Sequence, residues 1–247
     1  MVLRGVVDPA LCASIVEEVQ AALAPLVGPA EFEADLGYPG APSDRAQPGG
    51  ETPRRLLHAY ARSTTLRQLA LAPAVTTPIK KFLRTEASAQ PDATLCLSQA
   101  HHNCVMTKFP GFSSATLWHQ DIRYWSFDQP QLISAWFALA EEHSANGGLQ
   151  LIPGSHRLSL GRGRLDRDLF LRPELPENAR LIESAQAVHL QAGDVLLFHC
   201  RTFHAAGRNN TNSIKLSPVF TYHLAQNRPI PGTRSAGYPP IDVSIDG

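Results

Sequence analysis

The segment LWHQDIRYW, residues 117–125, places a histidine and an aspartate two residues apart among apolar and aromatic neighbours. On a β-strand, residues i and i+2 point to the same face, so His119 and Asp121 would converge while Gln120 points away. A neutral imidazole nitrogen and a carboxylate oxygen suit a divalent metal such as Fe(II), which needs at least one further ligand from elsewhere in the chain. The same pair could instead be a half-buried histidine and an aspartate that caps a turn.

Short apolar runs bounded by Gly, Asn, Pro and Asp begin near residue 93 and predict the strands that would carry such a site. The runs are ATLCLSQ, LISAWFALA, LQLIPG, AVHLQAGDVLLFH and SIKLSPVFTYH. QAGD is a plausible hairpin turn between Leu190 and Val195. Many strands with few helices between them predict an antiparallel sandwich or barrel. The tail PGTRSAGYPPIDVSIDG is rich in glycine and proline and is expected on the surface.

The N-terminal third is predicted to be helical. Asp8 can cap a helix, a proline follows at the first helical position, and Pro25 ends the pattern. An apolar stripe recurs every four residues, at Leu11, Ile15, Val19 and Leu23. Residues 64–85 predict a second helical region, interrupted weakly by Pro73 and Pro78.

Length and composition indicate one globular domain, 1–247, with a helical part over about 1–90 and a β core over about 93–223. The loop GYPGAPSDRAQPGGETP, residues 37–53, could be an active-site lid or a mobile connection. The 22 basic and 22 acidic residues cancel, so no general attraction to nucleic acid or to an anionic membrane is expected.

The cellular location of the protein is inferred from three further features of the sequence. The start, MVLRGVVDPALCASIVEEV, meets acids and a proline too soon for a signal peptide. No apolar run reaches the roughly 18 residues that a membrane span needs. The cysteines lie far apart with no CxxC spacing, at Cys12, Cys96, Cys104 and Cys200. Reduced thiols in a cytoplasm are therefore expected, with no membrane partner.

Two downstream segments bear on the histidine–aspartate pair. They are GGLQLIPGSHR, residues 147–157, and GDVLLFHCRTFHAAGRNNTNSIKLS, residues 193–217. Taken with WHQD, and in this order, they resemble the phytanoyl-CoA dioxygenase family of Fe(II)- and 2-oxoglutarate-dependent oxygenases, over roughly residues 93–223. The resemblance implies a mainly β fold, a double-stranded β-helix (jelly roll, cupin-like) with N-terminal α-helices packed outside. It also implies Fe(II) as cofactor and 2-oxoglutarate as co-substrate.

The resemblance assigns metal ligands residue by residue. His119 and Asp121 match the family's first two iron ligands, and His204 matches the third. The third ligand follows the GD dipeptide by about ten residues and precedes an Asn-rich turn, as His204 does. His199, five residues earlier, is the alternative and fits the strand before that position.

The family's arginine for the distal carboxylate of 2-oxoglutarate lies eleven residues after the last ligand, where this chain has Lys215. Lysine offers a point charge without the bidentate fork of arginine. The alternation SIKLS puts Lys215 and Ser217 on one strand face, either inside the barrel or in solvent. Arg208 is an alternative partner. The replacement of the family's arginine by Lys215 leaves three possibilities open: weaker binding of 2-oxoglutarate, use of a different oxo-acid, or no use of a co-substrate.

Other residues match the family's pocket less specifically, and each could be merely structural. The co-substrate candidates are Thr211, Lys108 and Trp136. The substrate candidates are Arg123, Tyr124, Trp125, His156 and Arg157, the last two in a PGSHR segment that could be a simple turn. His101 and His102 are adjacent, would point opposite ways on a strand, and are interpreted as structural.

The implied reaction is hydroxylation of a small organic metabolite by dioxygen, with succinate and CO2 as co-products. Asp121 argues against the family's halogenating relatives, in which a small residue replaces the carboxylate. Two alternatives remain: a metal-binding jelly roll that acts as a sensor or binding module without turnover, and a zinc hydrolase. The hydrolase would need a general base, and Glu141 and Glu142 are the nearest glutamates in sequence.

Overall fold

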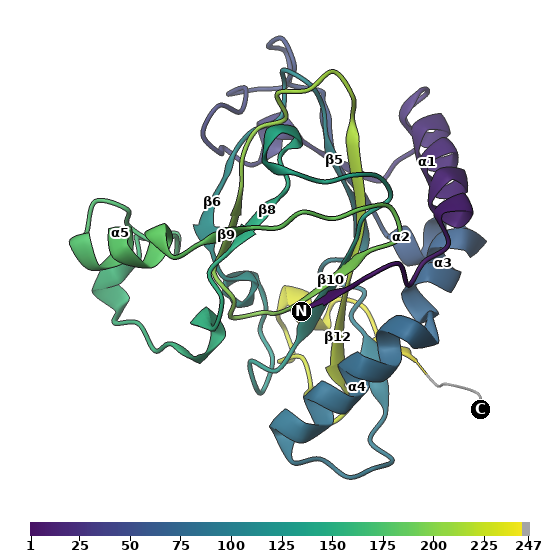
Figure 1. Ribbon diagram of the computed structural model, residues 1–247, viewed down its shortest axis with the longest axis vertical. Helices are drawn as coiled ribbons and strands as arrows, with labels where there is room; N and C mark the ends of the chain where they lie inside the picture. Colours follow the sequence, from purple (N-terminus) through teal and green to yellow (C-terminus); the bar gives the residue numbers. More distant parts are fainter. Residues whose placement is uncertain (244–247) are drawn as a thin grey trace.

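Two antiparallel β-sheets form the centre of this computed structural model, which describes residues 1–243 (Figure 1). The large sheet has the order β1-β10-β7-β12-β5-β3-β2, with β4 pairing β12 and β13. Its strands are β1 (Val2–Leu3), β2 (Ala30–Phe32), β3 (Pro53–Leu57), β4 (Leu95–Leu97), β5 (Cys104–Lys108), β7 (Ile133–Phe137), β10 (Val195–His199), β12 (Lys215–Leu224) and β13 (Ile241–Asp242). The small sheet has the order β6-β11-β8-β9, formed by β6 (Thr116–His119), β8 (Leu149–Leu151), β9 (Gln186–Ala187) and β11 (His204–Ala206).

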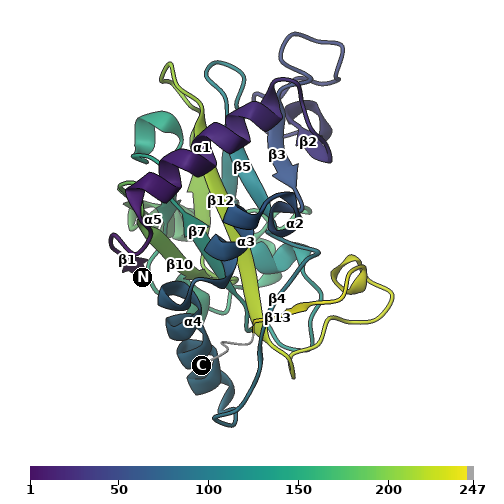
Figure 2. The ribbon, with the colours of Figure 1, turned by 90° about the vertical axis from the view of Figure 1, so that its right-hand side faces the viewer.

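The helices pack outside the sheets, which confirms the predicted mainly β architecture with external helices. They are α1 (Pro9–Leu23), α2 (Ala59–Arg62), α3 (Thr64–Leu71), α4 (Pro73–Ala87) and α5 (Pro176–Glu183). Figure 2 shows α1, α3 and α4 in front of the large sheet. Helix α5 lies beyond the small sheet, on the side away from α1 and α3 (Figure 1).

The N-terminal helix forms as its sequence predicts. The Asp8 carboxylate accepts a hydrogen bond of 2.8 Å from the Ala10 amide and so satisfies one of the free donors at the start of α1. Ile15 and Val19 are buried against the large sheet and its helices. The region 64–85 is two helices rather than one, because Pro73 starts α4 at a position that needs no N–H donor, whereas Pro78 lies inside α4.

Strand alternation divides the large sheet into an outer face and an inner face. On β12, Leu216, Phe220 and Tyr222 belong to the hydrophobic core that also contains the helices. Val219, on the same strand, belongs to a second cluster that includes residues of the small sheet. The inner face therefore looks into the space between the two sheets, where a site can be enclosed.

One expectation about local structure, the hairpin at QAGD, is wrong. A turn does form at QAGD, with the Asp194 amide 3.0 Å from the Gln191 carbonyl oxygen, but it closes no hairpin. Strand β9 before it pairs with β8 in the small sheet, whereas β10 after it pairs with β7 in the large sheet. The turn therefore carries the chain from one sheet to the other.

The described part of the C-terminal tail lies mostly on the surface, as expected, but its end joins the large sheet. Within its described part, β13 pairs with β4, and the Val243 amide donates to the Leu95 carbonyl at 2.8 Å. Val243 is buried because it joins the outer core of the large sheet. Residues 244–247 of this tail lie outside the described part of the chain.

Candidate active site

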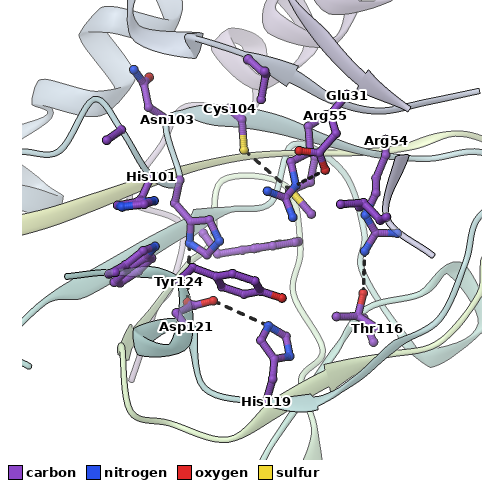
Figure 3. A pocket seen from close by; sticks show the side chains of 18 of the residues that line it. Glu31, Arg54, Arg55, His101, Asn103, Cys104, Thr116, His119, Asp121 and Tyr124 are labelled. Carbon is purple, nitrogen blue, oxygen red and sulfur yellow. Dashed lines mark hydrogen bonds and ion pairs between the residues drawn. The ribbon is translucent and has the colours of Figure 1, made fainter. Parts of the chain in front are cut away.

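Two neighbouring strands of the small sheet, with a residue just after one of them, bring three buried side chains together. His119 ends β6, His204 begins β11, and the two residues are direct partners across the pair of strands. Asp121 Oδ1 lies 3.7 Å from His119 Nε2 and 3.5 Å from His204 Nε2. The three candidate ligand atoms all lie within 4.8 Å of one another. Figure 3 shows His119 and Asp121 facing each other at one wall of a cavity.

Asp121 is not on the strand that the spacing predicted. Strand β6 ends at His119, and Asp121 is the first residue of a short 3-10 helix, η2 (Asp121–Tyr124). Gln120 between them is still extended, and its side chain donates to the Arg201 carbonyl, away from the cluster. One extended residue is enough to make the two side chains converge, so the predicted convergence occurs although the strand is shorter.

Backbone carbonyls set the orientation of both histidine rings. His119 Nδ1 lies 2.8 Å from the Leu117 carbonyl oxygen, and His204 Nδ1 lies 3.0 Å from the Thr202 carbonyl oxygen. A carbonyl oxygen only accepts hydrogen bonds, so Nδ1 carries the proton in each ring and the Nε2 lone pair faces Asp121. Burial, with the neighbouring His204, lowers the pKa of His119 to about 3, which keeps its ring neutral.

Asp121 is held as a carboxylate by its polar neighbours. Its Oδ2 lies 3.3 Å from Ser134 Oγ and 3.5 Å from His102 Nδ1. Burial alone would raise the pKa of Asp121, but His102, the two ring partners His204 and His119, and Ser134 together hold it below its ordinary value. Two imidazole nitrogens and one carboxylate are a donor set that suits Fe(II).

His101 and His102 are not on a strand, although the sequence suggested one, and whether they are merely structural stays a prediction. Both precede β5 in an irregular segment, and both line the cavity beside the cluster. His102 has a left-handed backbone, with φ of 38°, which turns its ring toward Asp121. Burial lowers the pKa of His102 to about 4, and its Nδ1 lies 3.3 Å from Ser134 Oγ, which in turn donates to Asp121.

His199 faces the other side of the large sheet. On β10, Val195 and Leu197 pack in the outer core, and His199 follows the same alternation. Its Nε2 lies 3.2 Å from Glu86 Oε1 on α4, and its Nδ1 accepts a hydrogen bond from the Arg201 amide at 3.1 Å. His199 is thus separated from His119 and Asp121 by its own strand.

The three clustered residues line a cavity of about 330 Å³ between the sheets. Its walls also include Glu31, Tyr38, Arg54, Arg55, His101, His102, Lys108, Thr116, Tyr124, Trp125 and Trp136. Tyr38 comes from the 37–53 loop, and its hydroxyl lies 2.7 Å from that of Tyr124. This loop therefore forms part of the cavity wall; its role as a lid stays a prediction.

Lys215 points inward and is only 5% exposed, so the alternative of a surface lysine is wrong. Its Nζ donates to Glu142 Oε2 at 3.1 Å and to Ser217 Oγ at 2.9 Å, and lies 4.8 Å above the Trp136 ring. Trp136 Nε1 and Ser217 Oγ also donate to the Glu142 carboxylate. Lys215 is thus already neutralised by an internal carboxylate and is not among the residues that line the cavity.

Lys108, the cross-strand partner of Lys215, does line the cavity. Its Nζ donates to the Ser114 carbonyl at 3.1 Å and to the Gly207 carbonyl. Within residues 1–243, no carboxylate lies within ion-pair distance of this ammonium. Burial, followed by the positive charges of Arg54 and Lys215, lowers the pKa of Lys108 to about 7.

Thr211 and Arg208 lie off the cavity. Thr211 Oγ1 donates to Asn209 Oδ1 at 2.7 Å within a tight turn. Arg208 Nε donates to the Ser113 carbonyl at 3.0 Å. Neither side chain lines the cavity, so both predicted co-substrate contacts are replaced by contacts that hold surface turns.

The substrate candidates separate into two groups. Tyr124 and Trp125 line the cavity, whereas Arg123 packs over Phe170, 3.8 Å from the ring centre, outside the cavity lining. His156 and Arg157 border a different cavity, on the side of β10 that carries His199. These last two do not line the cavity of the three clustered residues, so a substrate contact at His156 or Arg157 stays a prediction.

Sequence reasoning missed Arg55 and Glu31, which come from the part of the chain predicted to be helical. The available signal was weak: in PRRLL, Leu56 belongs to the outer core, so the alternation assigns Arg55 to the inner face. Nothing local in the sequence indicated that this segment pairs with β5.

Comparison with known proteins identifies the family. The model of the phytanoyl-CoA dioxygenase (PhyH) family matches residues 1–217, most of the chain. The protein therefore belongs to the phytanoyl-CoA dioxygenase family. This extends the resemblance, which rested on residues 93–223, over the N-terminal helices as well.

Individual relatives match shorter segments. The chain is 32% identical over 136 residues to an ectoine dioxygenase of Halomonas elongata, covering 48% of this chain and 41% of that protein. It is 27% identical over 118 residues to phytanoyl-CoA dioxygenase 1 of Oryza sativa subsp. japonica, covering 48% of this chain and 40% of that protein. The matches thus span less than half the length of these curated relatives.

Solved structures share the fold. The crystal structure of EctD from S. alaskensis with bound Fe superposes with a TM-score of 0.70 at 21% identity, over 93% of this chain and 74% of that one. The epimerase SnoN in complex with Fe3+, alpha ketoglutarate and nogalamycin RO superposes with a TM-score of 0.65 at 22% identity, over 94% and 81%. These similarities confirm the predicted jelly-roll architecture.

Proposed function

We propose that this protein is an Fe(II)- and 2-oxoglutarate-dependent dioxygenase that hydroxylates a small organic metabolite. The observation that supports it most directly is the buried cluster of His119, Asp121 and His204, whose two Nε2 lone pairs and carboxylate face one point in a cavity. Family membership and the iron and alpha ketoglutarate in the similar structures agree with this chemistry.

The three clustered residues would hold the iron, and the carbonyls of Leu117 and Thr202 would keep both rings in the ligating tautomer. When bound, Fe(II) with 2-oxoglutarate supplies the oxidant that inserts oxygen from dioxygen into a substrate C–H bond, with succinate and CO2 as co-products. His102 and Ser134 would orient the free oxygen of the Asp121 carboxylate.

We assign the anionic end of 2-oxoglutarate to Lys108 rather than to Lys215. Lys108 lines the cavity and has no carboxylate partner among residues 1–243, while two of the three donors of its ammonium are used by carbonyls. Lys215 is paired with Glu142, whose carboxylate would repel a second one. Trp136, which also lines the cavity, would wall this end of the pocket.

The substrate would enter between the cavity's aromatic residues, Tyr124 and Trp125, with Tyr38 at the rim. A cavity of about 330 Å³ shared with the co-substrate favours a small molecule. In residues 1–243 no helix is long and apolar enough to cross a membrane. The four cysteines are all buried free thiols, which supports the proposal of a cytoplasmic location.

One observation favours a second candidate, a metal-binding jelly roll without turnover. Lys215 stands where the family has its co-substrate arginine, and its ammonium is already hydrogen-bonded to the Glu142 carboxylate. No comparable observation favours a zinc hydrolase, because Glu142 is bonded to Lys215, Trp136 and Ser217 rather than placed beside the cluster.

Anaerobic titration of the metal-free protein with Fe(II) and then with 2-oxoglutarate distinguishes the two candidates. The dioxygenase is expected to develop the weak visible charge-transfer band of a 2-oxoglutarate chelate and, in air, to release succinate. If iron binds but no charge-transfer band develops, even at 2-oxoglutarate concentrations that would saturate related enzymes, the result would instead support the metal-binding module without turnover.

The assignment to Lys108 predicts a pH dependence of co-substrate binding. Lys108 has a pKa of about 7, so its ammonium is charged below that pH and loses its proton above it. Affinity for 2-oxoglutarate should therefore be full below pH 7 and fall by up to about tenfold per pH unit above it. Its charged and titratable neighbours are Arg54, Lys215, Glu33 and Arg208.

The matched control is Lys108→Arg, which stays charged over this range and should flatten the profile measured by the charge-transfer band. A profile that is identical in the wild type and in Lys108→Arg would show that another group controls binding.

A further inference from the structure

Arg55 and Glu31 form a charged pair on the cavity wall opposite the candidate metal ligands. They are direct partners across β2 and β3. Figure 3 shows both side chains reaching into the cavity from the upper strands, while His119 and Asp121 rise from the opposite side. Tyr124 lies between the two groups in this view, and all five residues line the same cavity.

The pair is poorly satisfied by the protein itself. The closest approach, between Arg55 Nε and Glu31 Oε1, is 3.6 Å, longer than a good hydrogen bond. Both atoms are buried, and neither has a hydrogen-bond partner among the described residues. The side chains are 19% and 18% exposed, and a buried donor and acceptor without hydrogen bonds cost free energy, so a pair left in this state in a cavity favours a ligand that completes it.

The neighbouring arginine shows what a structural role looks like in this fold. Arg54 donates to Ser114 Oγ at 2.6 Å, to Thr116 Oγ1 at 2.8 Å and to Glu33 Oε2 at 3.3 Å. Its guanidinium ties the start of β3 to β6 and to the segment before it. The Nε atoms of both arginines lack a hydrogen-bond partner among the described residues, but only Arg54 is anchored through its two terminal nitrogens, although the planar group of Arg55 also offers five donors.

We propose that Arg55 and Glu31 select a small zwitterionic substrate. The guanidinium binds the substrate's carboxylate, and the Glu31 carboxylate binds its cationic nitrogen. This inference rests on the proposed dioxygenase function and adds the chemical class of the substrate. The two charged groups of the ligand replace the long contact between the side chains with two hydrogen-bonded ion pairs.

The presence of Glu31 excludes simpler ligands of one charge. An anion on Arg55 would also approach the Glu31 carboxylate, and a cation on Glu31 would approach the Arg55 guanidinium. A zwitterion satisfies both groups and leaves the net charge of the cavity unchanged. The same argument separates this pair from the co-substrate, a dianion, for which Lys108 without an acidic partner is the better site.

The test screens charge classes of substrate on the iron-loaded enzyme with 2-oxoglutarate in air, with succinate release as the readout. The panel consists of small cyclic and acyclic amino acids and their N-alkylated forms, each with its N-acetyl derivative (an anion), its amide (a cation) and its N-acetyl amide (neutral). Zwitterions alone are expected to stimulate succinate release. Stimulation mainly by another charge class, or by no zwitterion, overturns the proposal.

Variants then connect the preference to the pair. Arg55→Gln and Glu31→Gln are each expected to raise the KM for the stimulating zwitterion by about 10- to 100-fold, the value of a hydrogen-bonded charge. Arg172→Gln, which removes an arginine from an exposed pair with Glu174, is the matched control and should leave the KM unchanged. An unchanged KM in Arg55→Gln also overturns the proposal.

The anaerobic charge-transfer band separates this inference from the function on which it rests. If the wild-type band is present and Arg55→Gln keeps it with unchanged 2-oxoglutarate affinity, the pair acts on the substrate. If Arg55→Gln weakens 2-oxoglutarate binding, the pair belongs to the co-substrate site and the zwitterion proposal is overturned. Absence of the band in the wild type contradicts the proposed dioxygenase itself.

Discussion

Replacing His204 with alanine is expected to weaken Fe(II) binding by at least about 100-fold and to abolish succinate release. Loss of an outer hydrogen-bond partner already costs metal sites about 10- to 100-fold in affinity, and His204 would supply one of only three protein ligands. Asp121→Ala should have the same effect. Fe(II) dissociation constants from anaerobic titration, with circular dichroism as a check on folding, measure it.

His199→Ala is the control for this prediction, because it removes a histidine five residues away in the same segment. His199 contacts Glu86 on the outer face of the large sheet, so iron affinity should stay within about twofold of the wild type, a difference below 0.5 kcal/mol. If His199→Ala loses iron and His204→Ala keeps it, the assignment of the third ligand is reversed.

The second large effect is expected at Lys215, and it concerns stability. Lys215→Met would leave the Glu142 carboxylate buried without a counter-charge, so the free energy of unfolding should fall by about 3–5 kcal/mol. The double variant Lys215→Met/Glu142→Gln removes both charges and keeps an acceptor for Trp136 Nε1, so it should recover most of the loss. Urea denaturation of the wild type, of Lys215→Met, of Glu142→Gln and of the double variant measures the cycle.

This cycle also tests the assignment of the co-substrate site. If Lys215 and Glu142 form a structural pair, the double variant should bind 2-oxoglutarate with wild-type affinity, because Lys108 is intact. A stable double variant that has lost 2-oxoglutarate binding would instead place the co-substrate carboxylate at Lys215. A single variant within 1 kcal/mol of the wild type would mean that Glu142 is not left as a buried charge.

The elements that could be predicted from the sequence are those determined by local patterns. The Asp8 cap and the four-residue apolar stripe place α1, and the apolar runs after residue 93 place β4, β7, β8, β10 and β12, whereas the strands before residue 93 were not predicted. The spacing of His119 and Asp121 produced a convergent pair even though β6 ends before Asp121. The order of the motifs indicated the family that residues 1–217 match.

The errors arose where a local pattern is compatible with two long-range arrangements. A tight turn at QAGD forms in either case, but only the pairing of β9 with β8 and of β10 with β7 shows that it joins two sheets. The glycine- and proline-rich tail similarly becomes buried at Val243 because β4 offers a free edge.

The sequence by itself determined that His119 and Asp121 converge and can ligate a metal, because ligand chemistry and the direction of side chains along an extended segment are local properties. Only the tertiary structure decided how the charges are distributed. The pairing of Lys215 with Glu142 joins residues 73 positions apart, and the long contact of Arg55 with Glu31 depends on β2 and β3 joining the sheet beside β5. Charge interactions depend on the distance between the groups and on their burial, and the separation of two residues in the sequence gives neither. The polar contacts of the cavity could therefore be assigned only from the tertiary structure.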